Sequence, residues 1–424
     1  MTRAAGAVVA HPGVMPVALE VARAFAERGM LERYETTFAY RPELPFDRAL
    51  GRIARRVLGA RAEQELQRRA IPDLAGADVQ RSPAWDGLRV LASRLGAGDV
   101  VADRLWERMT LAFDAGVARR LRPNTRLVYG FEHGCHATFT RARELGVATV
   151  LDMAAPHYAF AQCVLAEQVA LFPELRTDYW QATQPLARER NARKQAELDL
   201  ADLVIANSSF TARSLTDSGF AASRVRVVSL AAPPVDRSWR SAARSDTRTL
   251  LFAGAISPHK GAHLLLEAWS KLGDPAGAEL LLAGGWSLPE RLRDPLPAGV
   301  RVLGRVPRAE LFAHYTRASA LVLPSLGDGF GLVVSEALAH GLPVIATRSV
   351  GAADLIEEGR NGWVIESGNV AALTARMQWC LEHPRELHAM REAAELSVLQ
   401  RPWSKYRTDL LATVCGYLEG RPGA

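Results

Sequence analysis

The sequence has few cysteines, few lysines and no long apolar run, and these deficits exclude several classes of protein. Four cysteines stand far apart in 424 residues, at positions 135, 163, 380 and 415, without a C-x-x-C pair. This spacing disfavours a zinc site or a disulfide framework. No apolar run approaches the ~18–20 residues that span a bilayer, and residues 1–10 lack the features of a signal peptide. We therefore expect a cytoplasmic protein.

Length and composition describe what remains. Hydrophobic residues make up 48% of the chain and charged residues 23%, which is typical of a soluble globular protein. At ~150 residues per domain, the chain predicts two large domains or three small ones. No G-x-G-x-x-G follows the first strand-like run, which disfavours a simple dinucleotide-dependent oxidoreductase.

Short apolar runs alternate with helical stretches, and this alternation predicts two doubly wound α/β units with parallel sheets. The first series of expected strands covers residues 4–11, 36–40, 125–131, 147–153, 202–207 and 224–230. Residues 231–249 are rich in Pro, Ser, Arg and Asp and predict a linker. The second series covers residues 249–253, 279–283, 300–303, 321–324, 344–347 and 363–365, followed by expected helices over 369–395 and 403–418.

We accordingly expect three segments. Residues 1–235 form an N-terminal Rossmann-like domain, residues 236–400 form a C-terminal Rossmann-like domain, and residues 401–424 form a helix that crosses back to the first domain. Ligands of doubly wound sheets bind beyond the carboxyl ends of the strands, so the loops after strands are the expected sites.

The stretch 323–347 carries the richest chemistry, because an apolar strand runs there into a glycine-rich loop and a helix. Gly329 and Gly331 permit close backbone approach, and a helix N-terminus offers unpaired N–H groups to an anion. Together they predict a phosphate site. Asp328 and Glu336 flank this loop, and a carboxylate placed further along the helix can accept hydrogen bonds from the vicinal hydroxyls of a ribose.

The acid-x7-Glu spacing around Gly-Phe-Gly-Leu, followed by Glu-Ala-Leu-Ala-His-Gly-Leu-Pro-Val-Ile-Ala-Thr, resembles the retaining GT-B glycosyltransferases of family four. Residues 252–269 and 351–363 are similar to other parts of that family, and residues 201–211 fit it more weakly. The resemblance implies two Rossmann-like domains that face a central cleft, with residues 1–235 on the acceptor side and residues 236–400 binding the nucleotide-sugar donor. It also implies metal-independent transfer of a sugar, with retention, from a nucleotide sugar to a glycan or lipid-linked acceptor of the cell surface, without a cofactor.

The resemblance further implies roles for individual residues. Those expected to bind the donor are Gly13, Gly254, Lys260, Val306, Phe330, Gly331, Leu332 and Glu336. Asp328 and His133 are expected at the reacting sugar, with His136 and His157 as alternatives to His133. In this family the leaving phosphate is described as taking the acceptor proton, so the electrostatic clamp on the diphosphate carries most of the catalysis.

Two residues depart from the family pattern. Ala255 stands where an arginine is common, and Asp328 stands where glutamate is usual. These departures leave a donor-binding pseudoenzyme as an alternative. A GT-B relative such as a sugar-nucleotide epimerase is a second alternative, whereas a phosphorylase is disfavoured because the few lysines are poorly placed for pyridoxal.

The net charge of +6 lies in the first part of the chain. Residues 1–240 hold 33 basic against 27 acidic residues, and the rest hold 19 of each. The segment 48–69 has seven arginines against two glutamates, and residues 46–59 form an expected amphipathic basic helix. This pattern is typical of an element that docks on an anionic membrane surface or acceptor. The alternative is a surface helix packed on its domain; nucleic-acid binding is disfavoured.

Overall fold

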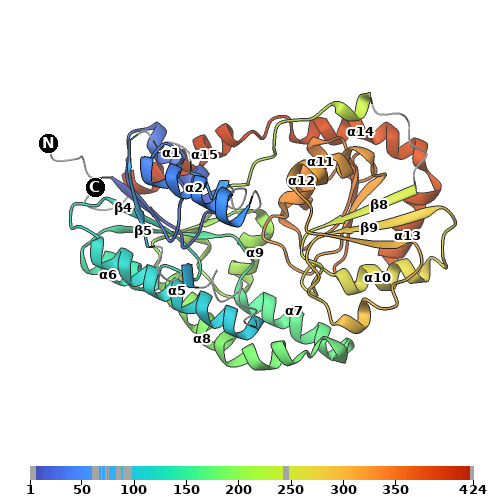
Figure 1. Ribbon diagram of the computed structural model, residues 1–424, viewed down its shortest axis with the longest axis horizontal. Helices are drawn as coiled ribbons and strands as arrows, with labels where there is room; N and C mark the ends of the chain where they lie inside the picture. The colour runs from blue at the N-terminus through green and yellow to red at the C-terminus, as the bar shows by residue number, and fades with distance from the viewer. Residues whose placement is uncertain are drawn as a thin grey trace. The chain divides into compact units, whose positions relative to one another are not determined.

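In the computed structural model, the described residues are 6–59, 66–67, 69–71, 74, 76–82, 87–88, 98–241 and 248–420, with the side chains of 46, 50, 54, 57 and 58 excepted. Two parallel sheets, each covered by helices, confirm the predicted doubly wound α/β architecture (Figure 1). None of the described helices is both long enough and apolar enough to cross a membrane.

The chain divides into two compact units that are not continuous in sequence. The first comprises Met1–Asp152, Gln181–Ile205 and Arg407–Ala424, and the second comprises Met153–Trp180 and Ala206–Tyr406. Residues 153–180 and 206–235, which we expected in the first domain, therefore lie in the second unit. Their packing gives the reason, since Phe160 and Ala154 contact the loop at Gly327 and Gly329.

The first sheet has the strand order β3-β2-β1-β4-β5-β6-β7. Its strands are β1 (Ala7–Ala10), β2 (Leu31–Thr36), β3 (Asp78–Arg81), β4 (Leu127–Phe131), β5 (Ala148–Met153), β6 (Leu203–Ala206) and β7 (Val225–Val227). The helices in this part of the chain are α1 (Pro16–Glu27), α2 (Pro45–Leu58), α5 (Asp99–Arg120), α6 (His136–Glu144), α7 (Tyr158–Leu171), α8 (Asp178–Leu200) and α9 (Ser209–Asp217), of which α7 and α9 lie in the second unit. Strand β1 pairs in parallel with β2 and β4. In Figure 1, α1 and α6 lie on opposite faces of this sheet.

The second strand differs from the expectation of 36–40, because β2 is Leu31–Thr36. Three of its six residues, Glu32, Arg33 and Glu35, are charged, so apolar patterning does not mark it as a strand. In the fold they are buried and paired: Arg33 Nε donates to Glu35 Oε1 at 2.6 Å, and Arg120 Nη2 reaches Glu35 Oε2 at 2.6 Å. Buried charges persist in proteins when they are paired in this way.

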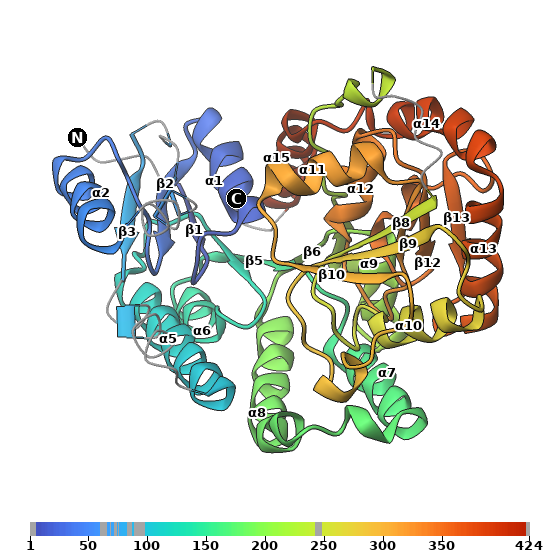
Figure 2. The same ribbon diagram turned by 45° about the vertical axis from the view of Figure 1, so that its right-hand side comes forward.

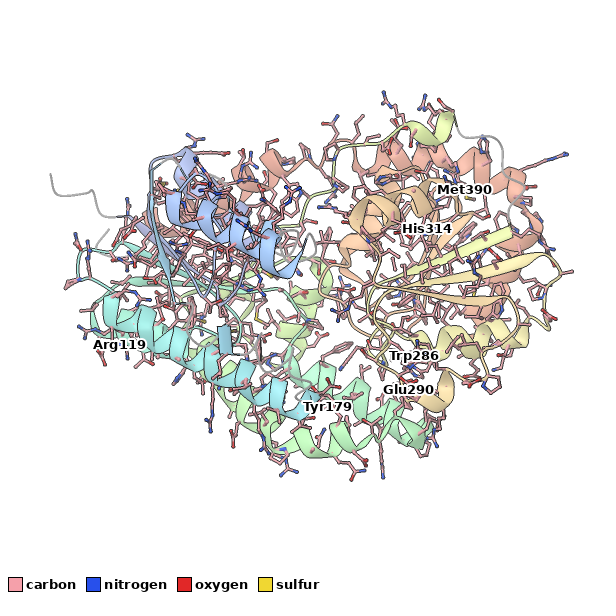
Figure 3. All side chains as sticks on the ribbon, viewed as in Figure 1. Arg119, Tyr179, Trp286, Glu290, His314 and Met390 are labelled. Atoms are coloured by element: carbon pink, nitrogen blue, oxygen red, sulfur yellow. The ribbon has the colours of Figure 1, made fainter. Side chains whose placement is uncertain are left out.

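The second sheet has the strand order β10-β9-β8-β11-β12-β13. Its strands are β8 (Arg248–Ala253), β9 (Ala278–Ala283), β10 (Val300–Gly304), β11 (Ala320–Leu323), β12 (Val344–Thr347) and β13 (Gly362–Ile365). Its helices are α10 (Ala262–Lys271), α11 (Arg308–Arg317), α12 (Leu332–Ala339), α13 (Val370–Glu382) and α14 (Pro384–Val398). Figure 2 shows these strands side by side, and Figure 3 labels His314 on α11 and Met390 on α14.

The end of the chain corrects one further expectation. The single helix expected over 369–395 is broken into α13 and α14 at Pro384, because proline cannot donate the helical hydrogen bond and holds His383 outside the helical region. The last helix, α15 (Trp403–Glu419), carries Arg407, which pairs at 2.6 Å with Glu20 of α1 inside the first unit.

Both sheets reverse their strand order at an inner strand, β1 in the first and β8 in the second. At such a switch point the loops after two adjacent strands leave in opposite directions and open a crevice. The loops after β1 and β4, and those after β8 and β11, therefore mark one candidate site in each unit.

Candidate functional site

In the second unit, the glycine-rich loop after β11 packs too closely to accept side chains. Gly331 has φ 82° and caps α12, and a Cβ there would lie 2.7 Å from Val350 Cγ1. A Cβ at Gly329 would lie 2.1 Å from the carbonyl oxygen of Ala154. The loop thus needs glycine both for its left-handed backbone at Gly331 and for the close approach at Gly329.

The start of α12 presents backbone donors. Among the residues that the structure describes, none accepts a hydrogen bond from the amides of Phe330, Gly331 or Leu332. Unpaired amides at a helix N-terminus, with the positive end of the helix dipole, favour an anion. The structure thus leaves all three predicted amides available.

Lys260 and Asp328 are brought together as an ion pair, although 68 residues separate them. The lysine side chain is 28% exposed and the aspartate 14%. The carbonyl of His259 accepts from Leu326 N at 2.9 Å and from Ser325 Oγ at 3.1 Å, which ties the loop after β8 to the loop after β11. The crevice therefore holds a cation beside a carboxylate at the predicted positions.

Glu336 has its contacts on helix α11. Its Oε1 lies 3.2 Å from Arg308 Nη2, and its Oε2 accepts from the Tyr315 hydroxyl at 3.2 Å. Burial raises the pKa of Glu336, and the charge of Arg308 opposes that rise. The carboxylate is thus held in place by two residues of α11, of which Arg308 is 65% exposed.

The remaining predicted donor residues of the second unit, Gly254 and Val306, follow strands of the same sheet. Gly254 follows β8 with φ 135°, and a Cβ at Gly284, after β9, would lie 1.7 Å from its carbonyl oxygen. Val306 follows β10 and is half-buried. Arg305 beside it is exposed, and its Nε would lie 3.0 Å from a Cβ at Gly285. Arg305 therefore places a cation at this edge of the sheet, where Ala255 replaces the arginine that is common in the family.

In the first unit, a pocket of about 340 Å³ opens at the crevice between β1 and β4. Its walls include His11, Gly13, Phe38, Trp106, Glu132 and His133. The structure thus brings the predicted Gly13 and His133 to one pocket. His11 Nδ1 lies 2.7 Å from the carbonyl oxygen of Gly13, and burial lowers the pKa of His11 to about 4.

His133 is held rigidly at this pocket. It has φ 83°, and its ring stacks on Trp106 at 4.6 Å between centroids. Its Nε2 lies 3.3 Å from Glu107 Oε2 and 3.2 Å from Arg193 Nη2. Burial and then the charge of Arg193 lower the pKa of His133 to about 3. The ring is neutral near pH 7, so it suits a hydrogen-bonding role better than proton transfer.

The residues that hold His133 come from α5 and α8 and were missed in the sequence. Glu197 accepts from the amides of His133 at 2.5 Å and Cys135 at 3.0 Å, and burial raises its pKa to about 7. Lys194 pairs with Glu132 at 3.0 Å. Lys194 is one of only four lysines in the chain, which is the one feature that could have drawn attention to α8.

The two alternative histidines take other positions. His136 is the first residue of α6. His157 caps α7, where its ring accepts from Ala159 N at 3.3 Å and its amide donates to Ser214 Oγ at 2.9 Å. Of the three candidates, His133 is the one that lines the pocket.

The basic segment is described in part. Arg48, Arg52, Arg55 and Arg56 are exposed on α2, and Ile53 among them is 59% exposed. Residues 60–65 and 68, and most of the expected apolar side chains of this helix, lie outside the described residues. Among the described residues, no group of three or more His, Cys, Asp or Glu is arranged to hold a metal ion.

Parts of the chain are similar to known proteins. Residues 236–397 match the family described as glycosyl transferases group 1. A D-inositol 3-phosphate glycosyltransferase of Pseudarthrobacter chlorophenolicus is 31% identical over 243 residues, which cover 52% of this chain and 57% of that protein. A glycogen synthase of Mycobacterium tuberculosis is 29% identical over 188 residues, 42% of this chain and 44% of that protein. The chain thus spans about half the length of these curated relatives.

Solved structures extend the likeness to nearly the whole fold. HepE of Anabaena, in complex with UDP, has a TM-score of 0.60 at 16% identity and covers 97% of this chain and 100% of its own. Sucrose-phosphate synthase of Thermosynechococcus elongatus has a TM-score of 0.63 at 16% identity and covers 98% of this chain and 100% of its own. At these identities the likeness concerns the fold, which is GT-B.

Proposed function

From the match of residues 236–397 to the glycosyl transferases group 1, we propose that the chain is a retaining glycosyltransferase. The donor is a nucleotide sugar bound in the second unit. The acceptor is a hydroxyl of a glycan or lipid-linked sugar, received at the pocket of the first unit. The reaction uses no metal and no cofactor.

One observation carries this proposal: Lys260, Asp328 and the unpaired amides at the start of α12 converge on one crevice, within the segment that matches the family. An ammonium and amides suit a diphosphate, and a carboxylate suits the hydroxyls of the sugar attached to it. The UDP complex of HepE, which shares the fold, supports the same class of ligand.

The chemistry that follows is a substitution at the anomeric carbon. The bond from the sugar C1 to the diphosphate oxygen breaks, and a bond from C1 to the acceptor oxygen forms. The acceptor proton passes to the departing diphosphate. Negative charge grows on that diphosphate in the transition state, where Lys260 and the amides stabilise it most strongly.

The test is to incubate the purified chain with UDP-glucose, UDP-galactose, GDP-mannose and ADP-glucose and to measure release of the nucleoside diphosphate. Proton NMR of the product reports whether the anomeric configuration is retained. Release that requires an acceptor supports transfer. Conversion of a nucleotide sugar with no acceptor present would support an epimerase, and tight binding without turnover would support a pseudoenzyme.

For the first unit we propose peripheral docking of α2 on anionic lipid. The support is the exposed set Arg48, Arg52, Arg55 and Arg56 with the exposed Ile53. Each basic residue near such a surface contributes about 1 kcal/mol, so replacing all four with Gln should abolish sedimentation with phosphatidylserine vesicles at low salt. Replacing the exposed Arg348, Arg360, Arg301 and Arg293 of the second unit is the control of equal charge. Equal sedimentation of both quadruple variants would contradict docking through α2.

A further inference from the structure

The segment after β6 contacts the glycine-rich loop of the donor crevice. Ser208 is 1% exposed and caps helix α9 by accepting from Thr211 N at 3.0 Å. The same hydroxyl donates to the carbonyl oxygen of Gly329 at 2.5 Å. Thr211 Oγ1 is 3.2 Å from that carbonyl, but its single proton also has Asn207 Oδ1 at 2.9 Å. Ser208 is therefore the principal donor to Gly329.

Three consecutive carbonyls of this loop are held. The carbonyl of Asp328 accepts from Gly351 N at 3.0 Å, that of Gly329 from Ser208, and that of Phe330 from Ala352 N at 2.6 Å. The three donors lie together, since a Cβ at Gly351 would lie 2.4 Å from Ser208 Oγ and 2.1 Å from the Gly329 carbonyl oxygen. The loop thus presents its carbonyls to one side.

The opposite side follows from peptide geometry. In a planar trans peptide the carbonyl of one residue and the N–H of the next point in opposite directions. Fixing the carbonyls of 328, 329 and 330 therefore directs the amides of Gly329, Phe330 and Gly331 away from Ser208 and Gly351. Among described residues, none accepts from these three amides. Successive amides that face one way form a concave anion site.

We propose that Ser208 is a positioning residue for the donor diphosphate: its hydroxyl holds the Gly329 carbonyl so that the Phe330 amide faces the phosphate. The inference rests on the proposed function, because it concerns the same donor crevice. It also gives a role to the segment 201–211, whose resemblance to the family had no function attached. Without the Ser208 hydroxyl the Gly329–Phe330 peptide loses its principal hydrogen bond, and the Phe330 amide is directed less firmly.

The experiment measures binding of two kinds of ligand to the full chain. Calorimetric titration measures binding of UDP, GDP and ADP, and saturation-transfer NMR measures binding of the matching nucleosides. We expect Ser208→Ala to weaken binding of the diphosphate about tenfold and to change nucleoside binding less than twofold, because the nucleoside carries no phosphate. A merely structural role would weaken both ligands alike. Equal loss for both ligands, or diphosphate binding as tight as in the wild type, would overturn the proposal.

Two further variants separate positioning from helix capping. Ser208→Gly removes the hydroxyl but keeps a residue that is acceptable at a helix N-cap. It should therefore weaken diphosphate binding about tenfold, and it provides the test if Ser208→Ala does not fold. Asn369→Ala removes the exposed cap of α13, whose side chain accepts from Ala372 N at 2.9 Å, and should leave diphosphate binding unchanged. A wild-type chain that binds none of the three diphosphates would instead overturn the proposed function.

Discussion

The two crevices differ in how the chain builds them. In the second unit, the loops after β8 and β11 carry their own functional residues, Lys260 and Asp328, within short motifs. In the first unit, the loop after β4 carries His133, but helices α5 and α8 supply the Glu107, Arg193 and Glu197 that hold it. The functional residues of the second crevice thus lie within short sequence motifs, whereas those of the first crevice come from segments that are distant in the sequence.

The difference extends to electrostatics. The ion pair in the second crevice is partly exposed, with Lys260 at 28%, so an incoming anion can compete for the lysine. The ion pairs around His133 are nearly buried, with Glu107 8% and Arg193 12% exposed, so they are already committed to the fold. We conclude that the second crevice is built to exchange partners with a ligand and the first to hold a fixed shape.

The strongest test of this contrast is Lys260→Ala. Because the lysine is the cation at the diphosphate, its loss should lower kcat/KM about 1,000-fold, or about 4 kcal/mol, and weaken nucleoside diphosphate binding at least tenfold. The matched control is Lys271→Ala, which removes an exposed lysine paired with Glu267 at 2.6 Å on α10. Steady-state kinetics and calorimetry measure both quantities. Equal behaviour of the two variants would remove Lys260 from the site.

Asp328→Asn should separate binding from turnover. The substitution frees Lys260 from its partner and removes a negative charge, so we expect the nucleoside diphosphate to bind a few-fold more tightly. The carboxylate that orients the donor sugar is lost at the same time, so kcat should fall about 100-fold, or about 2.7 kcal/mol. Calorimetry with UDP and initial rates with the donor check the two signs. Weaker UDP binding would show that Asp328 does not compete for Lys260.

The same contrast explains what could be predicted from the sequence. The residues of the second crevice lie on the loops after β8 and β11, which are neighbouring strands of the sheet. The glycine-rich loop and the helix after it predicted an anion site beside Asp328, whereas Lys260 was predicted from the resemblance to family four. The helices that hold His133 gave no such pattern, because their functional charges are buried by tertiary packing. Strand β2 was misplaced for the same reason: Glu35 is buried against Arg33 and Arg120, which periodicity does not report.

Ser208 is an intermediate case. It follows β6 and caps α9, a position for which serine is among the preferred residues. Its contact with Gly329 joins residues 121 positions apart and could not be predicted from local pattern. The second unit therefore also contains a contact that only the folded structure shows, and this contact holds the glycine-rich loop after β11.

The smallest expected effect concerns the fixed character of the first crevice, and His133→Asn tests it through pH. The pKa of His133 falls from 6.5 to about 3 on folding, so the unfolded chain binds a proton between these values that the native chain does not. The contribution of His133 to the free energy of unfolding is therefore full above pH 6.5 and is lost as the pH falls below that value.

The unfolded variant does not bind that proton, so its free energy of unfolding does not fall with pH at this position. The difference in free energy of unfolding between wild type and variant should therefore shrink by about 1.4 kcal/mol between pH 7.5 and pH 5.5, because pH 5.5 lies one unit below the unfolded pKa. Urea unfolding of both proteins at the two pH values measures this difference of differences. The comparison is necessary because Asp152 and Glu197, whose pKa values burial raises to about 7, act in the opposite direction in both proteins and cancel. A deficit independent of pH would mean that His133 accepts a proton in the folded chain, and the first crevice would then share the adaptable electrostatics of the second.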